Sequence, residues 1–201
     1  MNYQLELEKI LKQINDTTPK LLLHSCCGPC SSYVLEYLAP YFSITVDYYN
    51  PNIYPPAEYH RRAEEQARFI AETPRENAVQ FSEAVYEPQE FYTAVQGLEQ
   101  IPEGGERCFA CYALRLRHAA ETAKKGGYDF FTTTLSISPH KNAAKLNEIG
   151  YALEKEIGVK YLPADFKKKN GFKRSTQLAE AHGLYRQDYC GCAFSKAERG
   201  V

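Results

Sequence analysis

The sequence predicts an α/β domain built on a parallel sheet of about five strands. Short apolar runs rich in β-branched and aromatic residues alternate along the chain with longer amphipathic segments of helical period. Strands that alternate with helices usually pair in parallel through right-handed crossovers. The chain has 201 residues, of which 44% are hydrophobic, and this suffices for one domain with a sizeable core. We therefore expect a single α/β domain over residues 1–201, with residues 85–125 forming a helical insertion.

Five segments have the composition of buried strands. Residues 20–25 are an apolar run, and residues 42–50 combine β-branched with aromatic side chains. The other three expected strands are residues 78–84, 128–136 and 159–165. Parallel strands end at a common sheet edge, where ligands bind in open α/β folds. The segments that follow the first and fourth strands should therefore lie at the same edge.

Helical periodicity connects these strands. Residues 57–72 form a charged amphipathic segment, and residues 85–125 hold two helical patterns around the glycine turn PEGGERC. The second of these two helices should begin near Cys108. The helix after the fourth strand should have Ser138 as its N-cap and Pro139 in its first turn. The remaining helices are expected over residues 1–14 and 31–40 and within the basic segment 167–192.

Charge and hydropathy exclude several classes of protein. With 24 Lys and Arg against 25 Asp and Glu, the net charge is −1, so any surface for nucleic acid must be a local patch. The N-terminal segment is polar and amphipathic, which is not the pattern of a signal peptide. No run approaches the roughly 20 apolar residues of a membrane span. We therefore expect a soluble, cytoplasmic protein.

The seven cysteines of the chain require an explanation. Cytoplasmic thiols stay reduced, so a framework of structural disulfides is not expected. Thiols used only as small hydrophobic side chains would be scattered, whereas these seven lie in three tight groups. The groups are Cys26, Cys27 and Cys30; Cys108 and Cys111; and Cys190 and Cys192. Such grouping favours a metal site or a redox centre.

The first two groups occur where helices are expected to begin. Gly28 permits unusual backbone dihedrals and Pro29 suits a first helical turn, so the first strand can break directly into three thiols. Free amides at a helix start stabilise thiolates. The sequence CFAC, residues 108–111, places two thiols one turn apart on one helix face. That pair could be a redox dithiol, or half of either a zinc site or an iron–sulfur site.

The number of thiols suggests how they could be divided between two centres. One closed centre of four thiolates leaves three thiols, which can hold an open metal or act as a redox pair. Cys190 and Cys192 are spaced too closely for the usual zinc chelate, and they could form a strained disulfide that is easily reduced. They could also give one thiolate to each of two neighbouring centres. The residues alone leave zinc, iron–sulfur and metal-free dithiol chemistry open.

Six motifs occur together over residues 21–192. They are HSCCGPCS, YYNPNIYP, EYHRR, GERCFACYALRL, TTLSISPHK and GFKRSTQLAEAHGLYRQDYCGC. This set resembles the epoxyqueuosine reductases of the QueH type. The resemblance implies removal of the epoxide oxygen from epoxyqueuosine at the wobble position of tRNA, a two-electron, two-proton deoxygenation that completes queuosine biosynthesis. It also implies an iron–sulfur oxidoreductase that does not use cobalamin and that needs an electron donor, which the sequence does not identify.

The resemblance implies a role for each of the seven cysteines. It implies four ligands of a [4Fe–4S] cluster, namely Cys26, Cys27, Cys108 and Cys111. Cys190 and Cys192 are then a redox-active pair that can form a disulfide, or they bind a second, mononuclear iron together with Cys30. One of Cys26 and Cys27 could exchange roles with Cys190 or Cys192.

The resemblance also implies a more detailed fold. It is a three-layer Rossmann-like domain of the adenine-nucleotide-hydrolase type, in which the turn after the first strand usually cradles phosphate. Thiols occupy that turn here, so we expect nucleotide binding to be lost and residues 132–141, TTTLSISPHK, to line the substrate pocket. Tyr48, Asn50 and Asn52, after the second strand, are expected to line it as well. His24, inside the first strand, is expected to be a core imidazole rather than a ligand.

Residues 167–174, KKKNGFKR, with Arg186 nearby, are the expected tRNA surface. Five of these eight residues are Lys or Arg, and their attraction for phosphate would depend on salt and not on base sequence. Phe172, Tyr185 and Tyr189 are candidate stacking platforms for a base of the anticodon. A run of lysines is also common in loops that are merely solvated.

Two alternatives belong to other functional classes. One is a zinc-containing RNA-binding protein without redox chemistry, and the other is a metal-free dithiol oxidoreductase. Colour and iron content after anaerobic purification separate both from an iron–sulfur enzyme, because thiolate–iron charge transfer makes such a protein brown.

Overall fold

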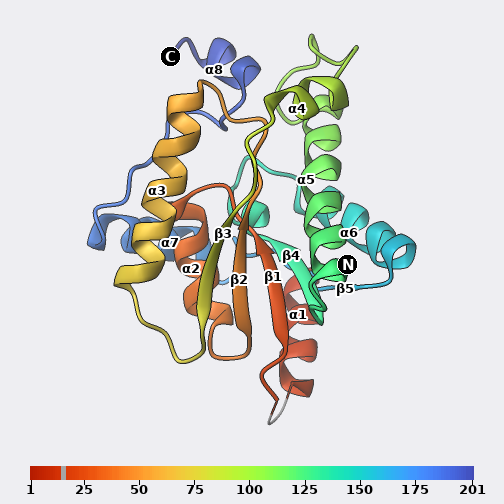
Figure 1. Cartoon of the computed structure of the whole chain (residues 1–201), viewed down its shortest axis with the longest axis vertical. Helices are drawn as coiled ribbons and strands as arrows, with labels where there is room; N and C mark the ends of the chain where they lie inside the picture. The colour runs from red at the N-terminus through yellow and green to blue at the C-terminus, as the bar shows by residue number, and fades with distance from the viewer. Residues whose placement is uncertain (15–16) are drawn as a thin grey trace.

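Five parallel strands form one sheet in the middle of the molecule, in the order β3-β2-β1-β4-β5 (Figure 1). The computed structural model describes residues 1–14 and 17–201. The strands are β1 (Lys20–His24), β2 (Ser43–Tyr48), β3 (Val79–Glu83), β4 (Phe130–Thr133) and β5 (Lys160–Tyr161). All four neighbouring pairs are parallel, and helices cover both faces of the sheet. The predicted three-layer α/β fold with a five-stranded parallel sheet is therefore confirmed.

The helices divide into two layers. On one face, α1, α2 and α7 share a hydrophobic core with β1 and β2; on the other, α5 and α6 share a core with β1 and β4. The helices are α1 (Tyr3–Gln13), α2 (Gly28–Leu38), α3 (Pro56–Glu72), α4 (Pro88–Ala94), α5 (Glu106–Lys125), α6 (Ala143–Ile157), α7 (Gly171–Ala181) and α8 (Ala193–Arg199). A 3-10 turn, η1 (Thr134–Ile137), follows β4.

The apolar sequence of β1 follows from its place in the middle of the sheet. Successive side chains of a strand point to opposite faces. Leu21 and Leu23 pack under α1 and α2, while Leu22 packs against α5. Because both faces of a parallel sheet are covered, a central strand must be apolar at consecutive positions. This is why KLLLH can form a strand without the alternation of a half-exposed sheet.

The expectations for the end of the fourth strand and for the start of α6 are wrong, and Pro139 lies before α6 rather than in its first turn. β4 ends at Thr133, and η1 replaces the rest of the strand expected over residues 128–136. Asn142 rather than Ser138 caps α6, because its side chain accepts a hydrogen bond from the Lys145 amide at 3.0 Å. The Ser138 hydroxyl instead accepts from the His140 amide at 3.3 Å. The short helix α8, after the last cysteine, is not predicted from the sequence.

Residues 85–125, the expected helical insertion, contain α4 and α5. α5 packs directly on β1 and β4 and alongside α6, so it forms part of the helical layer as well as carrying Cys108 and Cys111. Treating this segment as an insertion in a single domain stays a prediction. In the part of the chain that the structure describes, no helix is long and apolar enough to cross a membrane.

Gly150 allows α6 to lie close to Tyr161 of β5. A Cβ atom at Gly150 would lie 2.4 Å from atoms of the Tyr161 ring. We expect Gly150→Ala to lower the free energy of unfolding by about 1–3 kcal/mol, because the ring must move in a packed core. Urea denaturation of the single variant and of Gly150→Ala in a Tyr161→Leu background tests this. An equal loss in both backgrounds would show that the ring is not the cause.

Candidate active site

The turns after β1 and β4 meet at the carboxyl edge of the sheet. His24 and Thr133 are register partners at the ends of these strands, so the segments that follow them lie at the same edge, as expected. The buried imidazole of His24 lies 2.8 Å from Thr133 Oγ1 through Nδ1, and 3.1 Å from the Tyr49 carbonyl through Nε2. Burial, reinforced by the charge of Arg115, lowers the pKa of His24 to about 4. His24 is therefore a neutral core residue, and this prediction is confirmed.

Cys26, Cys27 and Cys30 form a compact group of thiols at the start of α2. Their sulfur atoms all lie within 4.8 Å of one another, and those of Cys26 and Cys27 are 3.9 Å apart. Hydrogen bonds from Cys27 and Cys30 hold the pKa of Cys26 well below its usual value. Hydrogen bonding to Cys26 in turn raises the pKa of both other thiols. The group can thus stabilise one thiolate among two thiols, and it is able to bind a metal.

Cys108 and Cys111 lie in the first two turns of α5. Cys108 packs against the core that contains Cys26 and Cys27, and Cys111 is buried in a small cluster with Cys192. Burial raises the pKa of both α5 thiols. The start of α5 therefore connects the N-terminal thiols with the C-terminal ones.

Gly191 allows the sharp turn between the last two cysteines. Its φ of +133° lies in the region that favours glycine, and a Cβ there would approach Arg62 Nη1 to 3.2 Å. The turn is anchored because the Tyr54 amide donates to the Gly191 carbonyl at 2.8 Å and Arg62 donates to the Cys190 carbonyl at 3.2 Å. As a result, Cys190 lines a pocket, whereas Cys192 is buried at the start of α8, where burial raises its pKa to about 12.

The three cysteine groups converge at one edge of the sheet, as expected. Cys26, Cys30 and Cys190 line one pocket, and Cys111 packs with Cys192. All seven cysteines are free thiols in the structure. The division of the seven between a cluster and a second centre stays a prediction, although the structure does place Cys30 within the first group.

A pocket of about 200 Å³ opens beside these thiols. Residues 137–141 form part of its wall, so the prediction for residues 132–141 is confirmed for the second half of that segment, whereas residues 132–136 are buried and do not line the pocket. Tyr48, Asn50 and Asn52 do not line it, and that prediction is wrong. Tyr48 lies in the core beside Tyr59, and the Asn50 amide donates to the Ser25 carbonyl at 2.8 Å.

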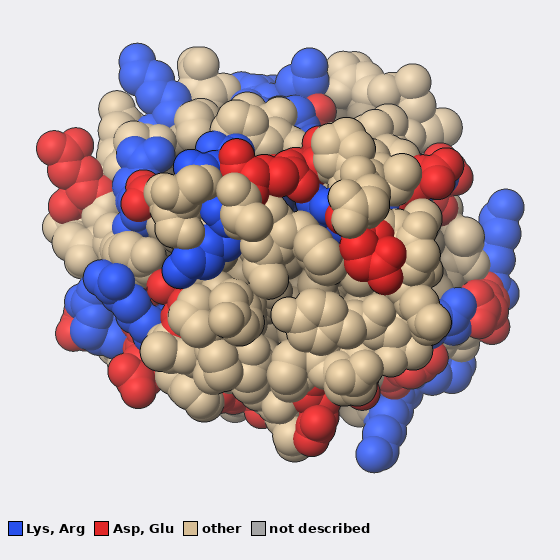
Figure 2. Space-filling model, turned by 90° about the horizontal axis from the view of Figure 1, so that it is seen from above, with Lys and Arg blue, Asp and Glu red and all other residues tan. Residues whose placement is uncertain are grey.

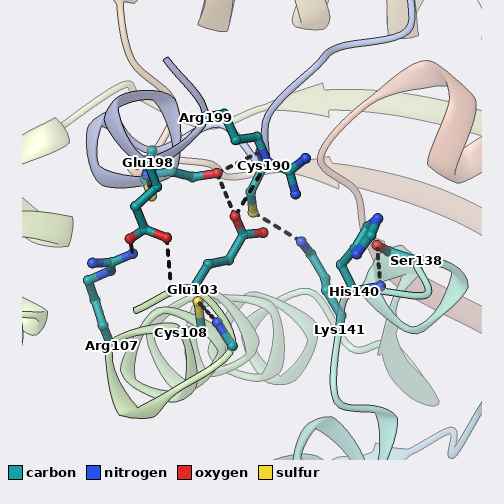
Figure 3. Close-up of polar contacts among 12 residues, drawn as sticks. Glu103, Arg107, Cys108, Ser138, His140, Lys141, Cys190, Glu198 and Arg199 are labelled. Carbon is teal, nitrogen blue, oxygen red and sulfur yellow. Dashed lines mark hydrogen bonds and ion pairs between the residues drawn. The ribbon is translucent and has the colours of Figure 1, made fainter. Parts of the chain in front are cut away.

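Two cations that the sequence analysis does not single out lie among the thiols. Lys141 points toward Cys190, and its Nζ donates to the Cys190 sulfur at 3.0 Å (Figure 3). Burial disfavours the Lys141 ammonium more than any single neighbour favours it, but negative charge on Cys190, Tyr112 and Cys26 together raises the Lys141 pKa. Arg115, one turn after Cys111 on α5, is 1% exposed. The four-residue spacing of Cys111 and Arg115 puts both on one helix face, and this signal could have been found in the sequence.

The C-terminal segment is tied to the glycine turn before α5 (Figure 3). Arg107 Nη2 lies 2.6 Å from Glu198 Oε1, and the Ser195 hydroxyl donates to Glu103 Oε2 at 2.8 Å. These contacts join α8 to the start of α5. They hold the two cysteine-bearing segments together.

Three of the five cations in the expected tRNA surface are paired with carboxylates. The pairs are Lys167–Asp165 at 2.9 Å, Lys169–Glu8, and Arg174–Glu36 at 2.7 Å. Such pairing leaves less net positive charge for phosphate than the run of residues suggests.

Of the three candidate stacking platforms, only Phe172 is available. Its side chain is 40% exposed at the pocket. Tyr189 also lines the pocket, but it is buried and its hydroxyl donates to the Tyr54 carbonyl, so its ring is not open for stacking. The ring of Tyr185 is covered by the Arg61 guanidinium, which lies 3.4 Å from the ring centroid.

Comparison with known proteins identifies the family. The family model "Epoxyqueuosine reductase QueH" matches residues 21–198. Epoxyqueuosine reductase QueH of Streptococcus pyogenes serotype M1 is 42% identical over 208 residues, which cover 100% of this chain and 82% of that protein. The protein of the same name from Staphylococcus epidermidis is 42% identical over 207 residues, covering 100% of this chain and 87% of that one. The chain therefore belongs to the epoxyqueuosine reductase QueH family.

Proposed function

We propose that the protein reduces epoxyqueuosine to queuosine in tRNA, as the names of its relatives suggest. Two electrons and two protons are consumed, both carbon–oxygen bonds of the epoxide break, an alkene forms and the oxygen leaves as water. The observation that best supports this chemistry is the convergence of thiols from three distant segments beside one pocket. The tRNA substrate makes a cytoplasmic location part of the proposal.

The thiols fit an iron–sulfur cofactor. Iron–sulfur clusters are held by four cysteine thiolates, and we assign this role to Cys26, Cys27, Cys108 and Cys111. The low pKa of Cys26 and the positive charge of Arg115 nearby both favour thiolates at this edge of the sheet. When bound, the cluster would supply low-potential electrons singly.

The remaining thiols form the second part of the proposal. Cys190 and Cys192 act either as a dithiol that can be oxidised to a disulfide, or, with Cys30, as ligands of a mononuclear iron. Cys190 lines the pocket, and the Lys141 ammonium beside its sulfur stabilises negative charge that develops there. Electrons come from a donor that is still to be identified.

We propose that tRNA approaches across the rim of the pocket. Figure 2 shows this end of the molecule, where basic and acidic side chains intermix around an uncharged centre. The exposed residues His140, Phe172 and Arg186 all line the pocket. Among the described residues, Arg186 has no carboxylate partner. It is therefore better placed than Arg174 to contact phosphate.

Arg186→Ser is expected to weaken tRNA binding and to lower the slope of log affinity against log salt by about 1, because one phosphate contact is lost. Arg174→Ser is the matched control, since the same charge is removed from a residue that already pairs with Glu36. Filter binding at several salt concentrations measures both slopes. A larger change of this slope for Arg174→Ser than for Arg186→Ser would show that residues 167–174, and not the rim near Arg186, form the tRNA surface.

The function itself is tested with anaerobically purified protein, a chemical reductant and tRNA that carries epoxyqueuosine. Mass spectrometry of the digested nucleosides should show the loss of one oxygen atom, and the protein should contain iron and labile sulfide. A colourless protein with one zinc, or a metal-free protein that leaves the tRNA unchanged, would favour the alternatives instead.

A further inference from the structure

Arg115 is a buried cation without a carboxylate partner. The other two deeply buried arginines each pair with a glutamate, Arg62 with Glu58 at 2.7 Å and Arg107 with Glu198 at 2.6 Å. Within residues 1–14 and 17–201, Arg115 forms no ion pair, and its Nη2 has no hydrogen-bond partner. An unpaired buried charge is strongly unfavourable, so a negative group must offset it in the working protein.

The hydrogen bonds of Arg115 place it between two cysteine groups. Its Nε donates to the carbonyl of Cys111 on the same helix at 3.4 Å, and its Nη1 donates to Asn50 Oδ1 at 3.4 Å. Asn50 in turn donates to the carbonyl of Ser25, the residue before Cys26. Arg115 therefore bridges the thiol-bearing start of α5 and the thiol-bearing end of β1.

The groups that can offset the charge of Arg115 are the thiolates. Burial disfavours its guanidinium, yet negative charge on Cys111, Cys190 and Cys26, in decreasing order, keeps the pKa of Arg115 raised. These three cysteines belong to the three separate groups along the chain. Arg115 is thus the one deeply buried arginine of the described chain without a carboxylate partner, and its hydrogen bonds hold it beside Cys111 and, through Asn50, beside the turn that carries Cys26.

We propose that Arg115 is the permanent counter-charge of the thiolate centre, and that it sets both the metal affinity and the reduction potential of that centre. The inference rests on the proposed function, because it requires thiolates as ligands. A divalent ion held by four thiolates has a net negative charge, and each electron added to a cluster increases the negative charge. A fixed cation stabilises the more negative form, so it favours metal binding and raises the potential.

Arg115→Met, which removes the charge, and Arg115→Lys, which retains it, provide the test. Arg117→Met is the matched control, because Arg117 lies on the same helix, is exposed and pairs with Glu156. One measurement is the reduction potential of the anaerobically reconstituted protein. The other is the affinity of the reduced, metal-free protein for Co²⁺, followed by thiolate-to-cobalt absorbance.

Arg115→Met is expected to shift the one-electron redox equilibrium of the reconstituted cluster about tenfold toward its oxidised form. This corresponds to a reduction potential that is lower by about 59 mV. Its affinity for Co²⁺ should fall about tenfold, by loss of a cation next to the ligands. Arg115→Lys should retain most of both properties, and Arg117→Met should match the unaltered protein. Unchanged affinity and potential in Arg115→Met would overturn the inference.

Circular dichroism of the metal-free variants separates this role from a structural one. Removing an unpaired buried charge should not unfold the metal-free protein, so an unfolded Arg115→Met would also overturn the inference. If the unaltered protein forms no iron–sulfur cluster, the cofactor assignment of the proposed function fails. The Co²⁺ affinities then decide the role of Arg115 alone.

Discussion

Cys108→Ala is expected to remove the iron–sulfur absorbance of the anaerobically prepared protein and to reduce epoxyqueuosine reduction to the uncatalysed rate. Cys108 is one of four thiols assigned to the cluster, and a cluster with a missing thiolate is lost or unstable. Cys111→Ala should have the same effect unless Cys192, which packs beside Cys111, replaces it as a ligand. Iron and sulfide analysis, together with nucleoside mass spectrometry, measures both consequences.

The control for this experiment is Ala110→Ser. Ala110 lies between the two cysteines in the same helical turn, and its replacement adds a hydroxyl group without removing a thiol. This variant should retain iron, sulfide and activity. A Cys108→Ala protein with a full complement of iron would show that the four ligands are assigned wrongly, while leaving the family and the reaction untouched.

Lys141→Met is expected to lower kcat by about 10²–10³-fold, because a fixed positive charge aimed at developing negative charge contributes that much to catalysis. The ammonium of Lys141 lies 3.0 Å from the sulfur of Cys190, and both residues line the pocket. Methionine keeps most of the length of the side chain and loses the charge. The effect should fall on kcat more than on KM, because the charge is needed where the reaction proceeds and not at the tRNA surface. Steady-state kinetics with purified tRNA separates the two parameters.

Lys145→Met provides the comparison. Lys145 lies one turn further along, in the first turn of α6, where it pairs with Glu148 at 2.6 Å on the surface. Its loss should leave kcat unchanged, since exposed ion pairs contribute little. Iron content is measured in both variants. A loss of activity in Lys141→Met that merely follows a loss of iron would assign Lys141 to assembly of the centre and not to the reaction.

The order of strands and helices could be predicted from the sequence because periodicity and β-branched runs are local signals. The ends of elements were less predictable. Asn142 and Ser138 are both good N-caps, and which of them starts α6 depends on how η1 and the following turn leave β4. β5 was expected over residues 159–165 but is only two residues long in the structure, because only Lys160 and Tyr161 pair with β4. The residues at which these elements begin and end therefore depend on contacts with neighbouring elements.

The sequence by itself determined how the thiols are grouped: they form three groups, two of them at expected helix starts, and the first group follows a strand that must end at the same edge as its parallel neighbours. Only the tertiary structure decided which charges act on those thiols. Arg62 and Arg107 are neutralised by glutamates, whereas Arg115 has no such partner among the described residues and is hydrogen-bonded to the Cys111 carbonyl. The sequence gives no sign that the lysines and arginines of residues 167–174 have carboxylate partners, yet three of the five form ion pairs. The reason is physical: the effect of a charge depends on its burial and on the distance to its partners, and packing brings those partners from distant parts of the chain.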